Sequence, residues 1–381
     1  MNKILKETEC WVFYSADGTD KFFKKFFGGE VGRKLPESFV VLSKDKTFLI
    51  TSTLDIDNVK GFNGTTLSYN SSAEIDMHLV KIFTELKFPK EIYLNYSSIS
   101  ALDSLGYGGF IKLQKRIKEA YKSNKFKIKS GENLILSAGE NNTEEDIENM
   151  RKVTVRTQEI MGQVFVAMKV GISEKEIEQL AISFLGEGEE ASFEPIILIG
   201  ENLTKGGHAN PSDKKLQKGE TVYIDFGIRV IAENGKTYCS DLQRMGYALK
   251  DGETKAESGV QKVFDTLIKA IDLGRRAMKP SKKGHQIDEI VRGYVLKSGY
   301  PSYNHGTGHP VGSLVHELGT TLAGKNKLRF TTMRKLALNG IYTVEPRIAI
   351  KNGGSIEEMV LVTEKGGEFL GSPQKKLYLI K

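Results

Sequence analysis

Apolar and polar residues alternate through residues 221–249, a pattern typical of β-strands with one buried face. Asn234-Gly235 lies between two such runs and predicts a turn, because both residues tolerate a positive φ. The segment is therefore expected to form a β-hairpin. The apolar positions of the predicted strands are Val222, Ile224, Phe226 and Ile228 before the turn and Tyr238, Leu242 and Tyr247 after it.

Two acidic residues, Asp225 and Asp241, lie in these apolar strands, where burying a charge is costly unless a cation compensates it. A two-residue loop at the turn would place the two carboxylates on opposite faces of the sheet. A three-residue loop pairs 232 with 236, sets Asp241 across from Gly227, and brings both acids to one face. A shared metal ion thus requires the longer loop or a compensating bulge.

The remaining pattern predicts two mixed α/β domains, 1–140 and 141–381, because residues 137–146 are polar and rich in turn formers. In the second domain, Thr143 with Asp146 and Ser173 with Glu176 are expected to cap two amphipathic helices. The elements expected in the first domain are a strand at 11–14, helices at 20–27, 74–86 and 101–123, a hairpin of strands 38–43 and 47–52, and a strand at 91–97.

Composition narrows the function class. The 381 residues are 39% hydrophobic and 27% charged, values typical of a globular protein. The net charge is +7, but lysine is scattered along the chain, so nucleic-acid binding is not expected. The two cysteines predict neither a disulfide framework nor a cysteine-type zinc site. No secretory signal and no run of about 20 apolar residues is seen, so we expect a cytoplasmic protein without membrane association.

Histidines and glutamates add candidate ligands in the second domain. His305, His309 and His316 lie close together among glycines that allow close backbone approach, and a loop after a strand presents His208. A strand is expected at 340–350, with Glu345 inside it, and another at 354–364, with Glu357 and Glu358 at its start. Of this last pair, one side chain is expected to point inward and the other to water.

The order Asp225, Asp241, His309, Glu345 and Glu357, in the contexts HGTGH, TVEP and SIEE, resembles the "pita-bread" metallopeptidases of family M24. That family includes aminopeptidase P, prolidase and methionine aminopeptidase. The resemblance runs from about residue 140 to the C-terminus. The first domain is similar to the creatinase-type N-terminal domain of aminopeptidase P and prolidase, which methionine aminopeptidases lack, and this favours the proline-directed branch.

The resemblance implies a strongly curved antiparallel sheet with helices on its outer face and two divalent metal ions in the concavity. Asp225 and Asp241 would bind one metal, with Asp241 bridging to the second. His309 and Glu345 would complete the second site, and Glu357 would be the other bridge. A homodimer is also implied. Substrate contacts are implied for His208, for His316, which would hydrogen-bond the tetrahedral intermediate, and for His305.

The implied activity is hydrolysis of the Xaa-Pro bond at the N-terminus of peptides, with Mn(II) or Co(II) favoured by a carboxylate-rich site and Zn(II) possible. Glu345 would accept the proton from water, and His316 would donate to the developing oxyanion.

The alternative functions are an Xaa-Pro dipeptidase and a non-catalytic peptide-binding module. Ser355 stands where prolidases often have an arginine that holds the dipeptide carboxylate, which argues against strict dipeptidase action; Arg347 is a candidate replacement.

Overall fold

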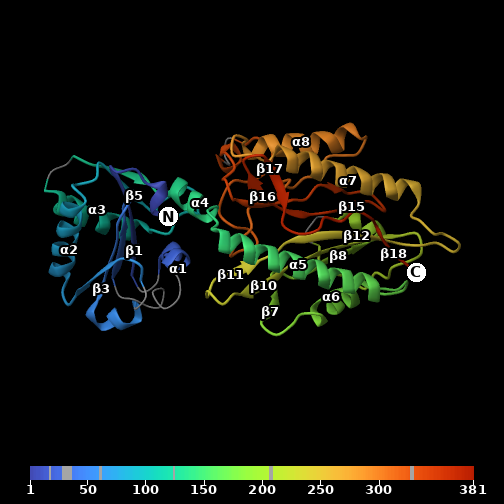
Figure 1. Cartoon of the computed structure of the whole chain (residues 1–381), viewed down its shortest axis with the longest axis horizontal. Helices are drawn as coiled ribbons and strands as arrows, with labels where there is room; N and C mark the ends of the chain where they lie inside the picture. Colours follow the sequence, from blue (N-terminus) through green and yellow to red (C-terminus); the bar gives the residue numbers. More distant parts are fainter. Residues whose placement is uncertain (17–18, 28–36, 60–61, 123–124, 206–208, 327–329) are drawn as a thin grey trace. The chain divides into compact units, whose positions relative to one another are not determined.

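The computed structural model describes residues 1–381 except 17–18, 28–36, 60–61, 123–124, 206–208 and 327–329 (Figure 1). The chain forms two compact units, Met1–Ala138 and Gly139–Lys381. Among the described helices, none has the length and apolar character needed to cross a membrane. Each unit is described separately below.

The first unit contains a six-stranded sheet with the strand order β4-β3-β2-β1-β5-β6. The expected hairpin is confirmed, because β2 and β3 pair antiparallel from Phe39–Ile50 to Leu42–Thr47. Strand β1 pairs antiparallel with β2 and parallel with β5, so the sheet is mixed. The strands are β1 Glu9–Ser15, β2 Ser38–Leu42, β3 Thr47–Ser52, β4 Thr65–Tyr69, β5 Glu91–Leu94 and β6 Lys127–Ser130.

Three of the helices described in this unit follow the expected segments, one of them with a shifted start, and the helix at Glu132–Gly139 was not predicted. Helix α3 begins at Tyr107, whereas the sequence pattern predicted a start at 101. The backbone amides of Ser104 and Leu105 instead donate to the carbonyl oxygen of Asn95, which holds this stretch out of a helix. The helices are α1 Lys21–Phe27, α2 Ser72–Glu85, α3 Tyr107–Tyr121 and α4 Glu132–Gly139.

The second unit places short strands between two pairs of helices (Figure 1). Its main sheet has the order β18-β12-β9-β8, and a second sheet has the order β13-β16-β17. The helices are α5 Glu144–Ala167, α6 Glu174–Ser183, α7 Ser258–Ala277 and α8 Gly284–Lys297. The strands are β7 Glu189–Ala191, β8 Ile196–Ile199, β9 Thr221–Phe226, β10 Ile228–Ile231, β11 Thr237–Cys239, β12 Leu242–Ala248, β13 Ile341–Val344, β14 Arg347–Ile348, β15 Gly354–Ser355, β16 Glu358–Thr363, β17 Gly366–Phe369 and β18 Tyr378–Ile380.

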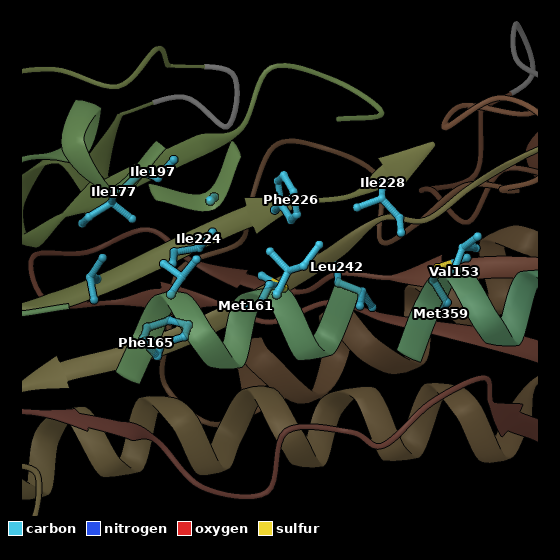
Figure 2. Close-up of a cluster of buried hydrophobic side chains, with 14 of the residues drawn as sticks. Val153, Met161, Phe165, Ile177, Ile197, Ile224, Phe226, Ile228, Leu242 and Met359 are labelled. Carbon is cyan, nitrogen blue, oxygen red and sulfur yellow. The ribbon is translucent and has the colours of Figure 1, made fainter. Parts of the chain in front are cut away.

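Helices α5 and α6 bury their apolar sides against β8, β9 and β12. Met161 and Phe165 of α5 belong to the same buried cluster as Ile224 and Phe226 of β9 and Leu242 of β12 (Figure 2). Both predicted capping boxes are present, Thr143 with Asp146 and Ser173 with Glu176. The other helix pair, α7 and α8, packs in a second buried cluster that includes residues of β13 and β16.

The hairpin of β10 and β11 is fixed to the start of α5 by Asp146. Its carboxylate accepts hydrogen bonds from Lys236 Nζ at 2.9 Å and Tyr238 Oη at 2.7 Å, besides capping α5 with Thr143. Asn234 at the hairpin tip donates to Glu145. Burial alone would raise the pKa of Asp146, but the hydrogen bonds outweigh it and lower the pKa to about 2.

Replacing Asp146 with asparagine is expected to lower the free energy of unfolding at neutral pH by about 2 kcal/mol. Because the folded-state pKa lies below the ordinary value of 3.8, this stabilisation is complete above pH 3.8 and disappears as the pH falls towards 2. Urea unfolding of Asp146→Asn and wild type at several pH values should therefore give curves that converge in acid. Asp251→Asn, which removes an exposed ion pair with Lys218, is the control and should have no measurable effect.

Candidate metal centre

Three of the predicted acidic ligands lie where strands are interrupted. Asp241 lies between β11 and β12, Glu345 between β13 and β14, and Glu357 between β15 and β16. The expected strands at 340–350 and 354–364 are thus each divided in two. An interruption releases a residue from the alternation of side chains along a strand, so several acids can turn towards one point.

The pairing of the hairpin around Asn234-Gly235 brings the two aspartates to one face. Strands β10 and β11 pair Ile231 with Thr237, and the amide of Ala232 donates to the carbonyl of Lys236, which leaves a three-residue loop closed by Gly235 at φ +73°. The predicted three-residue loop is confirmed. Continued along the chain, the same register pairs Gln243 with Asp225.

His309 reaches the acids from a loop that runs beside β13. Gly308 permits this approach, because a Cβ there would lie 2.0 Å from the carbonyl oxygen of Thr343. The Nδ1 atom of His309 lies 3.2 Å from the carbonyl of Pro310, and since a carbonyl only accepts, Nδ1 carries the proton. The other ring nitrogen, Nε2, lies 3.4 Å from Asp241 Oδ2 and 3.7 Å from Glu345 Oε1, where it is free to bind a cation.

The five predicted ligands gather into overlapping groups whose ligand atoms lie within 4.8 Å of one another. One group is Asp225, Asp241 and Glu357, and a second is His309, Glu345 and Glu357. Glu357 belongs to both groups, and Asp241 also forms a group with His309 and His316. The geometry therefore offers two adjacent cation positions with carboxylates between them.

Burial of so many acids is electrostatically costly without cations. Desolvation, followed by repulsion from neighbouring carboxylates, raises the pKa of Asp225 and that of Glu357 well above their usual values. Desolvation also raises the pKa of Glu345 to about 7, although the His309 imidazole opposes the rise. Within the described part of the chain, Asp225 Oδ1 and both carboxylate oxygens of Glu357 are buried and accept no hydrogen bond. Unpartnered buried oxygens of this kind suit divalent cations.

Glu358 differs from the expectation that one of the two adjacent glutamates faces water. Glu357 and Glu358 are both buried, at 0% and 2% exposure. Glu358 is compensated by Arg244 of β12, whose Nη2 lies 3.1 Å from Glu358 Oε2. Arg244 Nη1 also donates to the carbonyl of Glu357 at 2.9 Å, so the same guanidinium holds the backbone of a predicted ligand.

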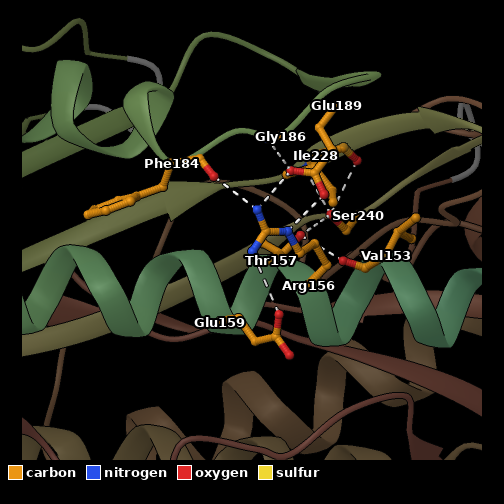
Figure 3. Close-up of polar contacts among 9 residues, drawn as sticks. All are labelled: Val153, Arg156, Thr157, Glu159, Phe184, Gly186, Glu189, Ile228 and Ser240. Atoms are coloured by element: carbon orange, nitrogen blue, oxygen red, sulfur yellow. Dashed lines mark hydrogen bonds and ion pairs between the residues drawn. The ribbon is translucent and has the colours of Figure 1, made fainter.

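Helix α5 fixes the chain just before Asp241. The hydroxyls of Thr157 and Ser240 share a hydrogen bond of 2.6 Å, and Ser240 Oγ accepts from the amide of Ile228 at 2.8 Å (Figure 3). Arg156, the neighbour of Thr157, pairs with Glu189 at 2.7 Å and ties α5 to the chain entering β7. The position of Asp241 is thus set by a helix remote from it in sequence.

The three predicted substrate-contacting histidines have different surroundings. His316 is exposed, and its ring stands edge-on to that of His309 with centroids 4.2 Å apart. His305 is half-buried, donates from Nδ1 to the carbonyl of Gly306 at 2.7 Å, and lies against Tyr303. His305 belongs to none of the ligand groups found among the described residues. His208 lies outside the residues that the structure describes.

Two buried polar residues of the centre were not predicted. Tyr223 donates from its hydroxyl to Asp225 Oδ2 at 3.0 Å, and Gln243 donates from Nε2 to the same oxygen at 3.1 Å. The signal was available in the alternation of strand side chains. Tyr223 is two residues before Asp225 in β9, and Gln243 of β12 pairs directly with Asp225, so both residues share a face of the sheet with this predicted ligand.

Comparisons with known proteins agree on one family. The model of metallopeptidase family M24 matches residues 148–364. An uncharacterized peptidase of Staphylococcus saprophyticus is 26% identical over 346 residues, which cover 89% of this chain and 88% of that protein. An uncharacterized peptidase of Staphylococcus aureus is 30% identical over 240 residues, which cover 61% of this chain and 63% of that protein.

Solved structures share the fold. An X-Pro aminopeptidase from Thermotoga maritima superimposes with a TM-score of 0.68 at 24% identity, covering 98% of this chain and 97% of that one. An Xaa-Pro dipeptidase from Bacillus anthracis superimposes with a TM-score of 0.65 at 21% identity, covering 97% and 95%. These similarities show the fold, a pita-bread unit preceded by an α/β unit.

Proposed function

The chain belongs to metallopeptidase family M24, and from that premise we propose that it is a dinuclear metal-dependent aminopeptidase that hydrolyses the Xaa-Pro bond at the N-terminus of peptides. The observation that carries the proposal is the convergence of four carboxylates and one imidazole, with buried oxygens that accept no hydrogen bond within the described residues. Two divalent cations held there would supply Lewis acidity and lower the pKa of water.

We assign Asp225 and Asp241 to the first cation and His309 and Glu345 to the second, with Asp241 and Glu357 shared. The two groups that have Glu357 in common support this division. Oxygen ligands with a single imidazole favour Mn(II) or Co(II), while Zn(II) remains compatible with the donor set.

The protein's own side chains would orient the peptide and move protons. Glu345 is half-buried and its carboxylate groups with His309 and Glu357, so it is placed to take a proton from water and pass it to the leaving amine. The exposed His316 beside His309 is placed to donate to the carbonyl oxygen as negative charge develops. We propose His208 and His305 as further substrate contacts.

Residues near Glu345 and Glu357 favour an aminopeptidase over a dipeptidase. Ser355 is buried and donates to the carbonyl of Pro346, so it provides no positive charge for a dipeptide carboxylate. Arg347 is 4% exposed and donates from Nη2 to the carbonyls of Leu203 and Lys205. Its guanidinium therefore holds backbone, which argues against the role of replacement carboxylate binder.

Metal-stripped protein should regain hydrolysis of alanyl-prolyl-alanine when Mn(II), Co(II) or Zn(II) is added back in turn. We expect a higher kcat/KM for this tripeptide than for alanyl-proline, because no cation at positions 355 or 347 is available to the dipeptide carboxylate. Chromatographic detection of released alanine measures both reactions. Preference for alanyl-proline would support the dipeptidase alternative, and no cleavage with any metal would reject both.

A further inference from the structure

Gln243 contacts three of the five residues assigned to the metals. Its side chain, 5% exposed on β12, lies opposite Asp225 of β9. Its backbone pairs with that of Glu357 through Glu357 N to Gln243 O at 3.2 Å and Gln243 N to Glu357 O at 3.4 Å. Its side-chain amide reaches Glu345 as well as Asp225.

The amide nitrogen of Gln243 joins two carboxylates that belong to different cation positions. Nε2 lies 3.1 Å from Asp225 Oδ2 and 3.4 Å from Glu345 Oε2, and an amide has one proton for each. Asp225 Oδ2 also accepts a hydrogen bond from the hydroxyl of Tyr223. These bonds leave Asp225 Oδ1 and Glu345 Oε1, which faces His309 Nε2 at 3.7 Å, as the oxygens available to the cations.

The side-chain amide oxygen of Gln243, Oε1, supports this orientation of the amide, with Nε2 towards the two carboxylates. Oε1 is buried and accepts no hydrogen bond from any described residue. Exchanging the amide nitrogen and oxygen would set Oε1 against two carboxylates and remove both bonds, so the observed orientation is the favourable one. A buried amide oxygen without a hydrogen-bond donor is destabilising. A cation or a cation-bound water at this site would give Oε1 a partner and remove that cost.

We propose that Gln243 is a positioning residue of the metal centre, whose amide fixes the spacing of Asp225 and Glu345 and thereby of the two cations. This proposal rests on the metal centre of the proposed function. Groups that hydrogen-bond to metal ligands typically change metal affinity on the order of 10–100-fold when removed. The effect should fall on loading of the cation pair, because the amide connects a ligand of each.

The test compares Gln243→Met with Gln374→Met. Methionine has a similar length and no amide. Gln374 is also buried, at 6% exposure, but donates to the carbonyls of Met245 and Lys376 and not to an assigned ligand. Calorimetric titration of metal-stripped proteins with Mn(II) measures affinity, and electron paramagnetic resonance of the loaded proteins detects the magnetically coupled pair.

Gln243→Met is expected to weaken binding of the Mn(II) pair by about 10-fold or more and to alter the coupled signal. Gln374→Met should keep the affinity within about twofold of wild type, whatever its effect on thermal unfolding. Wild-type affinity and an unchanged coupled signal in Gln243→Met would overturn the proposal. If that variant does not fold, Gln243→Asn, whose shorter side chain cannot span both carboxylates, is measured with the same two criteria.

Metal binding is measured without peptide, so the two proposals fail separately. Wild-type protein that binds two Mn(II) ions but leaves alanyl-prolyl-alanine intact would reject the proposed function alone. Active wild type together with unaffected metal binding in Gln243→Met would reject the role of Gln243 alone.

Discussion

Glu345→Ala is expected to lower kcat for alanyl-prolyl-alanine by about 10³–10⁴-fold. The substitution removes the proposed proton acceptor, which is also a proposed ligand of the second cation. The carboxylate lies 3.7 Å from His309 Nε2 and accepts from Gln243 Nε2. Its loss should therefore also weaken binding of the second Mn(II) ion. Steady-state kinetics and calorimetric titration measure the two effects.

The control for Glu345→Ala is Glu364→Ala, because Glu364 is exposed and lies beyond the end of β16. This variant should retain wild-type kinetics and metal content. A Glu345→Ala protein that is fully active and loaded with two metal ions would refute the assignment of Glu345.

Arg244→Met is expected to lower the free energy of unfolding of the second unit by about 3–5 kcal/mol. The pair with Glu358 is buried on both sides, with side chains 3% exposed, so removing the arginine leaves an uncompensated carboxylate. Burial already raises the pKa of Glu358, while Arg244 opposes that rise. Urea unfolding followed by circular dichroism measures the loss.

Arg229→Met is the matched control, because Arg229 pairs with Glu190 at the surface, where the side chains are 44% and 69% exposed. Its effect should stay below about 1 kcal/mol. The double variant Arg244→Met/Glu358→Leu should recover part of the lost stability, since no buried charge remains. Equal stability of Arg244→Met and wild type would show that the ion pair is not a structural requirement.

Local patterns in the sequence were sufficient to predict much of the fold. The hairpin of β2 and β3 and the capping boxes of α5 and α6 depend on residues near one another in the chain, and all three are confirmed. The three-residue loop between β10 and β11 followed from a chemical requirement, that both aspartates share a face. Each of these features depends on side-chain periodicity or turn chemistry that short segments carry.

Other features depend on distant partners and could not be predicted from local patterns. Glu358 is buried because Arg244, far away in sequence, supplies its counter-charge. The start of α3 was predicted too early because the carbonyl oxygen of Asn95 accepts hydrogen bonds from two backbone amides upstream of Tyr107. Neither partner is marked by any spacing in the sequence.

The sequence by itself determined the family and the five candidate ligands, because their residue types and surrounding motifs are written in the chain. Only the tertiary structure decided how these ligands meet. Interrupted strands turn Asp241, Glu345 and Glu357 towards one point, and Gln243 joins two of the ligands through its amide. The physical reason is that a shared cation site requires its candidate ligands to lie within a few ångströms of one another. These residues are far apart in the chain, and the packing of the helices and sheets sets the distances between them.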